Sequence, residues 1–432
     1  MILLALNELN INYIKEYIKR GKLQNFKTLF NNGVYKTTSE NKYELLEPWI
    51  QWTTLQTGLS YEEHKVLRLG DITKRSDLVQ IFEALENKNL SVGAISPFNA
   101  DNRLKKAKFF IPDPWTQTKA SGGFLISKLS KTISRFVNSN ATGGPSFVDL
   151  IWLLLGFVSF VRFKRWINFV KMFYLRKKPG VKAAILDMIL LEVFVTLQKK
   201  NKPDYSHLFF NGGAHVQHHY LFNSAIYDGP FENPEWYCPK DWDPLFMMLN
   251  SYDRIIGDLL ETGERIIGVT GLQQIPHDKK TFYWRPINHK AFLIELGVDV
   301  DFKVVPRMSR DFLIETNSPA DAIIVEITLN SYKDSESNRN IFSIDNRGES
   351  LFVEIIYSND ITDDLTFAGN NKVIKNLKNK LAFVAIKNGK HDGLGYIFSN
   401  KDLNLPEKIK LKDLYNIIIN FAVSDYKKLN KK

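Results

Sequence analysis

The stretch Ile2-Leu3-Leu4-Ala5-Leu6-Asn7-Glu8 decides the fold, because a short apolar run leads directly into a polar turn. An uninterrupted apolar run of this length is typical of a parallel strand that is buried on both faces. Apolar residues then recur at helical spacing over Ile11–Arg20 and Leu23–Phe30, and Asn31-Asn32-Gly33 ends the second helix. The first part of the chain therefore predicts a strand followed by helices.

The same alternation recurs along the chain. Further strands are predicted at Val34–Thr38, Ser91–Ile95, Tyr205–Phe210, Ile266–Thr270, Ala322–Ile327, Leu351–Ile356, Leu381–Ile386 and Gly395–Phe398. Further helices are predicted at Trp49–Gln56, Leu78–Leu85, His215–Phe222, Pro244–Glu261 and Leu411–Ala422. This order indicates an α/β protein with a mostly parallel central sheet and helices on both faces.

We predict that residues 1–118 form the N-terminal part of the core, 119–200 a helical, basic insertion or cap, and 201–432 the rest of the core. Within the insertion, the uncharged run Leu150–Val161 has 12 residues, whereas a membrane-spanning helix needs about 20. Basic and aromatic residues follow it. Residues 147–182 could therefore lie on an anionic membrane surface or pack as a cap on the domain, and the sequence leaves both interpretations open.

The composition bounds the class of protein. Apolar residues make up 44% and charged residues 24%, which is typical of a folded domain. The net charge of +11 favours a phosphate-bearing partner, and nucleic acid is not expected because the basic residues concentrate in one apolar insertion. A single cysteine, Cys238, excludes an internal disulfide framework. With no basic segment before the first strand, a cytoplasmic location is expected.

Ligands of open α/β sheets bind beyond the carboxyl ends of the strands. Four polar groups meet that condition: Asn7-Glu8-Asn10, Glu47–Thr54, His215–His219 and Thr270–Gln274. Five of the eight histidines lie in or beside such loops, namely His207, His215, His218, His219 and His391. His215 and His219, four residues apart on a helix, could be paired metal ligands or ordinary polar residues.

The order of these elements resembles the alkaline phosphatase superfamily, in particular its type I phosphodiesterase and nucleotide pyrophosphatase branch. The resemblance covers most of the chain and depends on four segments: Trp52-Thr53-Thr54-Leu55-Gln56-Thr57-Gly58 followed by Glu62-Glu63-His64, Pro203-Asp204-Tyr205 through Gln217-His218-His219-Tyr220, Tyr252 to Leu260, and Gly389-Lys390-His391 with Gly395-Tyr396-Ile397-Phe398.

The resemblance implies two metal ions held by aspartates and histidines, and a Thr or Ser nucleophile at a helix N-terminus. This chain departs from that pattern, because the corresponding positions carry Asn7 or Glu8, Pro48, Ala214 and Gly271-Leu272. Only His218 and His391 match ligand positions directly, with Glu8 as a third. One divalent metal ion is therefore the most that the resemblance implies, and the standard two-metal site is not expected.

The replaced positions are rich in polar side chains, which indicates a remodelled site. Amides suit the hydroxyl groups of a sugar, and Trp49 and Trp52 could stack on its ring or lie in the core. Glu8 or Glu47 is predicted as a general base, with His218 as the third catalytic residue. The predicted substrate-binding residues are Asn7, Asn10, Trp49, Gln51, His215, Gln217, His219, Gln273, Gln274 and Arg285, the last as a phosphate-pairing guanidinium.

The leading hypothesis is an enzyme that cleaves or transfers a phosphate-linked group. Its substrate would be a nucleotide-activated or lipid-linked sugar in surface glycan assembly, and it would act peripherally at the inner face of the membrane. One alternative is a single-metal phosphodiesterase or other hydrolase, with Glu8, His218 and His391 around the ion. Another is a catalytically inactive ligand-binding protein on the same fold.

Overall fold

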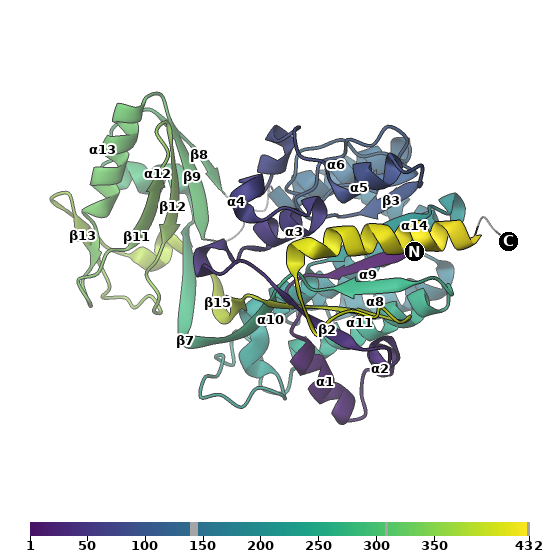
Figure 1. Cartoon of the computed structure of the whole chain (residues 1–432). Helices are drawn as coiled ribbons and strands as arrows, with labels where there is room; N and C mark the ends of the chain where they lie inside the picture. The colour runs from purple at the N-terminus through teal and green to yellow at the C-terminus, as the bar shows by residue number, and fades with distance from the viewer. Residues whose placement is uncertain (139–145, 307–309, 430–432) are drawn as a thin grey trace. The chain divides into compact units, whose positions relative to one another are not determined.

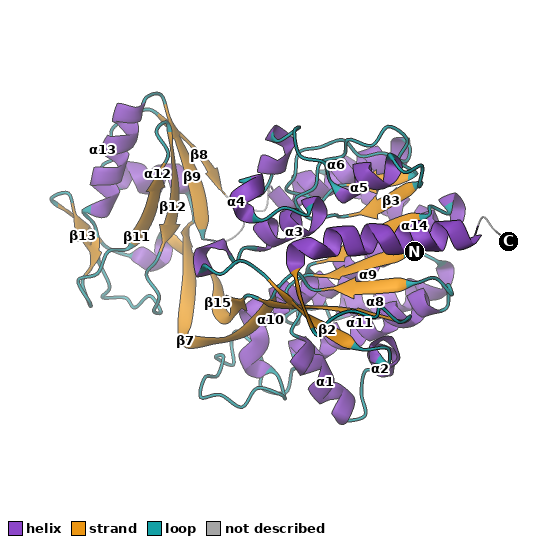
Figure 2. Ribbon diagram, viewed as in Figure 1, coloured by secondary structure: helices purple, strands orange, loops and turns teal. Residues whose placement is uncertain are grey.

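The computed structural model describes residues 1–138, 146–306 and 310–429. Within them the central sheet has eight strands (Figure 2). Their order is β17 (Lys408–Lys410), β2 (Val34–Thr38), β16 (Leu394–Ser399), β6 (Ile266–Val269), β1 (Ile2–Leu6), β5 (Tyr205–Phe210), β3 (Val92–Ile95) and β4 (Phe109–Ile111). All neighbours pair in parallel except β16, which is antiparallel to both β2 and β6. The predicted mostly parallel α/β class is confirmed.

Strand β1 lies inside this sheet and separates two apolar cores. Its residues Ile2, Leu4 and Leu6 face the first core, which is shared by helices α1 (Ile11–Lys19), α2 (Gln24–Phe30), α9 (Val181–Asn201), α10 (Gly212–Tyr220) and α11 (Pro244–Leu260). Leu3 and Ala5 face the second core, shared by α3 (Pro48–Thr57), α5 (Ile81–Glu86) and α14 (Leu414–Leu429). Helices α14 and α1 accordingly lie on opposite sides of the sheet (Figure 1).

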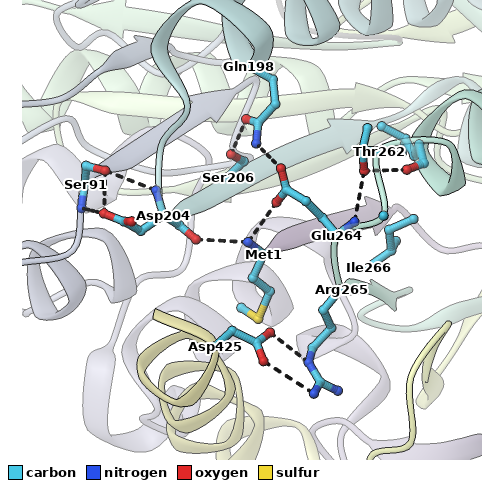
Figure 3. A network of polar contacts seen from close by, with 12 residues as sticks. Met1, Ser91, Gln198, Asp204, Ser206, Thr262, Glu264, Arg265, Ile266 and Asp425 are labelled. Atoms are coloured by element: carbon cyan, nitrogen blue, oxygen red, sulfur yellow. Dashed lines mark hydrogen bonds and ion pairs between the residues drawn. The ribbon is translucent and has the colours of Figure 1, made fainter. Parts of the chain in front are cut away.

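A polar network secures the edge of the sheet where β1, β5 and β6 begin (Figure 3). The carboxylate of Glu264 accepts hydrogen bonds from the amino nitrogen of Met1 and from the Gln198 amide, both at 2.9 Å. The side-chain amide oxygen of Gln198 accepts one from the Ser206 hydroxyl, and the Met1 nitrogen also donates to the backbone carbonyl oxygen of Asp204. These contacts hold the strand starts together, whereas the predicted site residues lie at the opposite edge.

The chain divides into two compact units, Met1–Pro276 with Gly389–Lys432, and His277–Asn388. Strands β7 (Gln273–Pro286) and β15 (Leu381–Asp392) carry the chain across the two boundaries. The second unit has a four-stranded antiparallel sheet in the order β11 (Phe342–Asn346), β12 (Ser350–Ile355), β9 (Asp311–Thr316) and β8 (Phe302–Pro306). A separate three-stranded sheet is formed by β10 (Lys333–Asp334), β13 (Phe367–Gly369) and β14 (Lys372–Ile374). The helices of this unit are α12 (His289–Glu295) and α13 (Pro319–Asn330). The prediction divided the chain into 1–118, 119–200 and 201–432. Both boundaries of the second unit lie inside the last of these ranges.

One predicted strand is wrong: residues Ala322–Ile327 lie in helix α13. The β-branched run Ile323-Ile324-Val325 favoured a strand, but the residues that precede it stabilise the start of a helix. The Ser318 hydroxyl caps it by accepting a hydrogen bond from the Asp321 backbone N–H at 3.2 Å, and Pro319 occupies the first turn. Ala322, Val325 and Leu329 then lie buried at helical spacing.

The predicted helical insertion contains α6 (Phe124–Asn138), α7 (Phe147–Phe160), α8 (Trp166–Tyr174) and α9. None of the helices in the described part of the chain combines the length and the apolar character needed to cross a membrane. Helices α7 and α8 both pack on α9, and the ring of Phe157 on α7 meets that of Phe169 on α8 at 5.3 Å between centroids.

His207, one of the histidines near a predicted loop, lies instead in the middle of β5 and is fully buried. Its neighbours in the sheet are Leu3 and Ala94, and its ring packs on Phe82 at 5.6 Å between centroids. Neither ring nitrogen has a hydrogen-bond partner among the described residues. Burial lowers the pKa of His207 from 6.5 to about 3, so the folded protein holds a neutral imidazole at physiological pH.

We expect the His207→Leu variant to be more stable than the wild type by about 1–3 kcal/mol at pH 7, because it removes an unsatisfied buried polar group with a modest change in volume. The gain should grow as the pH falls from 6.5 towards 3, by about 1.4 kcal/mol per pH unit, because only the unfolded imidazole takes up a proton in that window. Urea unfolding at pH 7 and pH 5 measures both effects. Equal stability of the two proteins at both pH values would contradict this account.

Candidate active site

Glu8 follows β1 at the carboxyl edge of the sheet and has a positive φ of 56°. Three hydrogen bonds hold its backbone there. The N–H of Glu8 donates to the Thr270 carbonyl oxygen at 3.0 Å, while its own carbonyl oxygen accepts from the Gln274 N–H and the Gln217 amide, both at 3.1 Å. These bonds join the loop after β1 to the loop after β6 and to α10, so a left-handed conformation unusual for glutamate is kept in place.

The side chain of Glu8 meets two histidines that are distant in the sequence. Its Oε2 lies 2.9 Å from Nε2 of His218 and 3.3 Å from Nε2 of His391. The two Nε2 atoms are 3.3 Å apart. Glu8 is buried, whereas the histidines are partly exposed. The three predicted metal-ligand residues are thus brought together, and the cluster keeps access to solvent through its imidazoles.

The topology of the sheet explains this convergence. Glu8 follows the end of β1, and His218 lies on α10, which follows the end of the parallel strand β5. His391 instead lies before β16, which runs antiparallel, so the start of that strand is at the same edge. Residues from both directions of the chain therefore meet at one edge of the sheet.

The charges in the cluster favour an ionised Glu8. Burial of the carboxyl group opposes ionisation, but the adjacent imidazoles of His391 and His218 act in the other direction and lower the pKa of Glu8 well below its ordinary value. The carboxylate also accepts hydrogen bonds from the Gln274 amide at 2.5 Å and the Asn7 amide at 3.1 Å. Glu8 is therefore available as an anionic ligand near neutral pH.

These donor atoms fit one divalent metal ion. The ligand atoms of Glu8, His218 and His391 lie within 4.8 Å of one another, and within the described chain no second group of this kind accompanies them. One carboxylate and two imidazoles are a common donor set that leaves a coordination position open, and the amide contacts to Glu8 provide the outer support that such ligands need. Ala214, Gly271 and Leu272, at the positions where the resemblance implies further ligands, offer no ligand side chain.

Glu47 lies beside the cluster, with its Oε2 3.9 Å from Nδ1 of His391. It immediately precedes α3, and its side chain is partly exposed. The first residue of α3 is Pro48, which has no hydroxyl group to serve as a nucleophile. The arrangement therefore offers a second carboxylate within reach of the cluster, at the positive end of a helix dipole.

The predicted amide residues hold the site together. Asn10 donates its N–H to the Gln217 amide oxygen at 3.1 Å, and its amide group to the Gln274 carbonyl oxygen at 2.8 Å. The Gln273 amide donates to Asp392 at 2.7 Å, and the Gln51 amide to the Leu45 carbonyl oxygen at 2.8 Å. These side chains are buried, so they position the loops that carry Glu8 and His391, and their predicted role in substrate binding stays a prediction.

The two tryptophans of α3 are differently placed. Trp52 is fully buried in the core and donates its indole N–H to the Asn7 amide oxygen at 2.7 Å, which supports the core interpretation for this residue. Trp49 is half-buried and donates its indole N–H to the Leu67 carbonyl oxygen at 2.9 Å. Sugar stacking on Trp49 stays a prediction.

The remaining predicted residues lie outside the cluster of Glu8, His218 and His391. His215 and His219 share a face of α10, with ring centroids 4.9 Å apart, but the cluster contains only their neighbour His218. Arg285 lies on β7 within the second unit. Their predicted roles in substrate binding stay predictions.

A buried pair under α10 was not predicted. Asp187 on α9 accepts hydrogen bonds from the Gly212 N–H at 2.9 Å and the Tyr252 hydroxyl at 2.6 Å, and that hydroxyl accepts one from the Gly213 N–H at 2.8 Å. Burial raises the pKa of Asp187 to about 7. The pair satisfies the first two N–H groups of the helix that carries His218. The adjacent glycines were a signal for it, because a Cβ atom at Gly212 would lie 2.5 Å from the Asp187 carboxyl oxygen.

Comparisons with known proteins found similarity in structure alone. No protein-family model matches the sequence, and no curated protein matches it. Similar solved structures include a phosphonoacetate hydrolase from Sinorhizobium meliloti 1021 in complex with phosphonoformate, at 13% identity and a TM-score of 0.45, covering 98% of this chain and 95% of that chain. Another is the murine ectonucleotide pyrophosphatase / phosphodiesterase 5, at 11% identity and a TM-score of 0.44, covering 98% and 94%. With TM-scores below 0.5, these similarities carry no conclusion about the chemistry of this chain.

Proposed function

We propose that the chain is a metal-dependent enzyme that cleaves or transfers a phosphate-linked group, with one divalent cation held by Glu8, His218 and His391. The observation that carries this proposal is the approach of these three ligand atoms to within 4.8 Å of one another. A divalent cation at such a site stabilises the negative charge that develops on phosphoryl oxygens. The net charge of +11 suits a phosphate-bearing substrate.

The chain's own residues supply the proton chemistry. Glu47 accepts the proton of an attacking water or acceptor hydroxyl, whose oxygen forms the new bond to phosphorus. The bond from phosphorus to the leaving oxygen breaks, and that oxygen keeps the electron pair. Pro48, at the start of α3, offers no nucleophile, and the attack that we propose is direct, without a covalent enzyme intermediate. The N-terminal turn of α3, beside Glu47, favours the anionic phosphate.

The substrate that we propose is a nucleotide-activated or lipid-linked sugar in surface glycan assembly. Support for the sugar comes from Gln273, next to the site, whose side-chain amide oxygen has no donor among the described residues and could accept a hydrogen bond from a hydroxyl group. A lipid-linked form would bring the enzyme to the inner face of a membrane as a peripheral protein. A panel of nucleotide sugars and lipid-linked sugars, assayed for phosphate-bond cleavage with and without added acceptor, tests this part.

Metal removal tests the proposal as a whole. Treatment with a chelator should abolish cleavage of a chromogenic phosphodiester, and one equivalent of zinc or manganese should restore it. Absence of bound metal in elemental analysis, together with no activation by added metal, would exclude the single-ion site.

The Glu47→Gln variant tests whether Glu47 acts as the general base and not as a metal ligand. We expect its turnover to fall by about 100-fold or more, because a general base is lost, while its affinity for the metal stays close to that of the wild type. Steady-state kinetics and calorimetric titration measure the two quantities. Glu62→Gln, which changes an exposed glutamate of the short helix α4 (Tyr61–His64), is the matched control. An unchanged turnover of Glu47→Gln would remove Glu47 from the mechanism.

A further inference from the structure

Helices α7 and α8 turn large apolar side chains toward solvent. Phe163, in the turn between the helices, is 82% exposed, and Tyr174, at the end of α8, is 84% exposed. Phe147, Leu154, Ile167 and Phe173 are also exposed. We call this outward side of residues 147–175 the apolar face. Large apolar side chains exposed in such numbers over two neighbouring helices are typical of an interaction site in a folded protein.

The apolar face is held firmly by the helices behind it. Gly156 on α7 packs so closely on Leu129 of α6 that a Cβ atom would lie 2.5 Å from the leucine side chain. Arg162, between α7 and α8, pairs with the buried Glu192 on α9 at 2.6 Å and with Asp258 on α11 at 2.7 Å. The outward apolar side chains are therefore presented by a fixed pair of helices, and they are not a consequence of poor packing.

The charges around the apolar face have one sign. Residues 147–178 contain seven arginines and lysines, of which Arg162 and Arg165 pair with Glu192 and Asp258, and a single acidic residue, Asp149. Asp149 is buried and pairs with Arg135 at 2.5 Å, so it does not offset the charge outside. Lys164, Lys171, Arg176 and Lys177 are exposed. A partner of this surface must therefore offer apolar material together with negative charge.

These properties decide between the possible partners. A second copy of the chain would bring two basic surfaces together, which like-charge repulsion opposes. An anionic bilayer offers acyl chains for the aromatic and aliphatic side chains and phosphate groups for the lysines. Helix α7, with 14 residues, is about 21 Å long, too short to span the roughly 30 Å of hydrocarbon but suited to lying in the membrane surface.

We infer that the apolar face of α7 and α8 docks on an anionic lipid bilayer and inserts Phe147, Leu154, Phe163, Ile167 and Phe173 below the headgroups, while Lys164, Lys171 and Lys177 contact lipid phosphates. The inference is independent of the metal site, because none of these residues takes part in the cluster around Glu8. An experiment can therefore contradict the inferred membrane binding without contradicting the proposed metal site, and the reverse also holds.

Flotation of the full chain with lipid vesicles tests this inference. The wild type should float with vesicles that contain phosphatidylglycerol and should remain unbound with vesicles of phosphatidylcholine alone. The variant Leu154→Ser, Phe163→Ser, Ile167→Ser, Phe173→Ser should bind about 10⁴-fold more weakly and no longer float, since each of the four inserted side chains contributes roughly tenfold. Lys171→Gln should weaken binding about fivefold at low salt.

The second unit offers a matched control. The variant Ile294→Ser, Ile323→Ser, Ile324→Ser, Ile327→Ser removes four exposed apolar side chains from α12 and α13 and should bind vesicles as the wild type does. Failure of the wild type to float with anionic vesicles at low salt would overturn the inference. Equal flotation of the wild type and the fourfold variant of Leu154, Phe163, Ile167 and Phe173 would also overturn it. A dimer that this variant dissociates, without vesicle binding, would assign the apolar face to a second copy and also overturn it.

Discussion

The His391→Ala variant is expected to bind zinc or manganese at least about 100-fold more weakly than the wild type and to lose phosphodiester cleavage to a similar extent. His391 supplies one of only three ligand atoms, so its loss leaves two, whereas losses confined to the outer support of a metal ligand already cost about 10–100-fold. The Glu8→Gln variant should behave alike, because it keeps the shape of the side chain but removes its negative charge. Calorimetric titration and steady-state kinetics give both measurements.

The control for the histidine variant is His277→Ala, which changes a histidine of the second unit and should leave the metal affinity unchanged. Thermal unfolding without metal shows whether each variant is folded. Added metal should raise the Tm of the wild type and hardly that of His391→Ala, because a ligand that binds the native state stabilises it by mass action. Metal affinity equal to that of the wild type in both Glu8→Gln and His391→Ala would refute the site.

The Arg162→Met variant is expected to lower the free energy of unfolding by about 3–5 kcal/mol. The guanidinium group of Arg162 donates to both carboxyl oxygens of Glu192, at 2.6 and 2.8 Å, and to Asp258. Asp258 keeps its contacts with Arg165. Glu192 is fully buried, and among the described residues it keeps only the Arg162 backbone N–H and a longer contact with Arg165. An almost uncompensated charge would remain in the interior, and urea unfolding measures its effect.

The double variant Arg162→Met, Glu192→Met should recover most of that loss, because it removes both charges and fills the space with apolar side chains. Arg176→Met is the matched surface control, since Arg176 is exposed and stacks on the Phe173 ring, and it should change stability by less than about 0.5 kcal/mol. A double variant as unstable as Arg162→Met would show that the loss comes from packing and not from the unpaired charge.

Strands β1, β3, β5 and β6 could be predicted because they are short apolar runs that are buried at every residue, whereas the three-residue strands β4 and β17 were not predicted. Val34–Thr38 and Tyr205–Phe210 have the predicted bounds, and the loop after β1 carries Glu8 to the predicted edge. The second unit could not be predicted as a separate body. Its antiparallel strands are half exposed and alternate in burial, as in Ser350–Ile355, so they lack the continuous apolar signal of a parallel strand.

The meeting of Glu8, His218 and His391 followed from the order of motifs and from the rule that ligands lie beyond strand ends. The contacts of individual amide side chains could not be predicted, because a glutamine can form hydrogen bonds with a ligand or with a loop of the protein equally well. Gln217 and Gln274 illustrate this, since both are occupied within the protein. The contact between Asp187 and the start of α10 joins residues from different helices; the adjacent Gly212 and Gly213 indicate a close approach there, but no pattern in the sequence identifies Asp187 as the partner.

The antiparallel course of β16 gives the proposed metal site a place in the order of synthesis. Glu8 leaves the ribosome first and His391 last of the three ligands, after the whole second unit has been made. A nascent chain therefore offers at most two ligands and holds a metal ion weakly, because metal binding and folding are coupled. Under the proposed function, tight metal capture would mark a finished chain, and a translation product that stops before residue 391 would lack one of the three ligands, however well its earlier part folds.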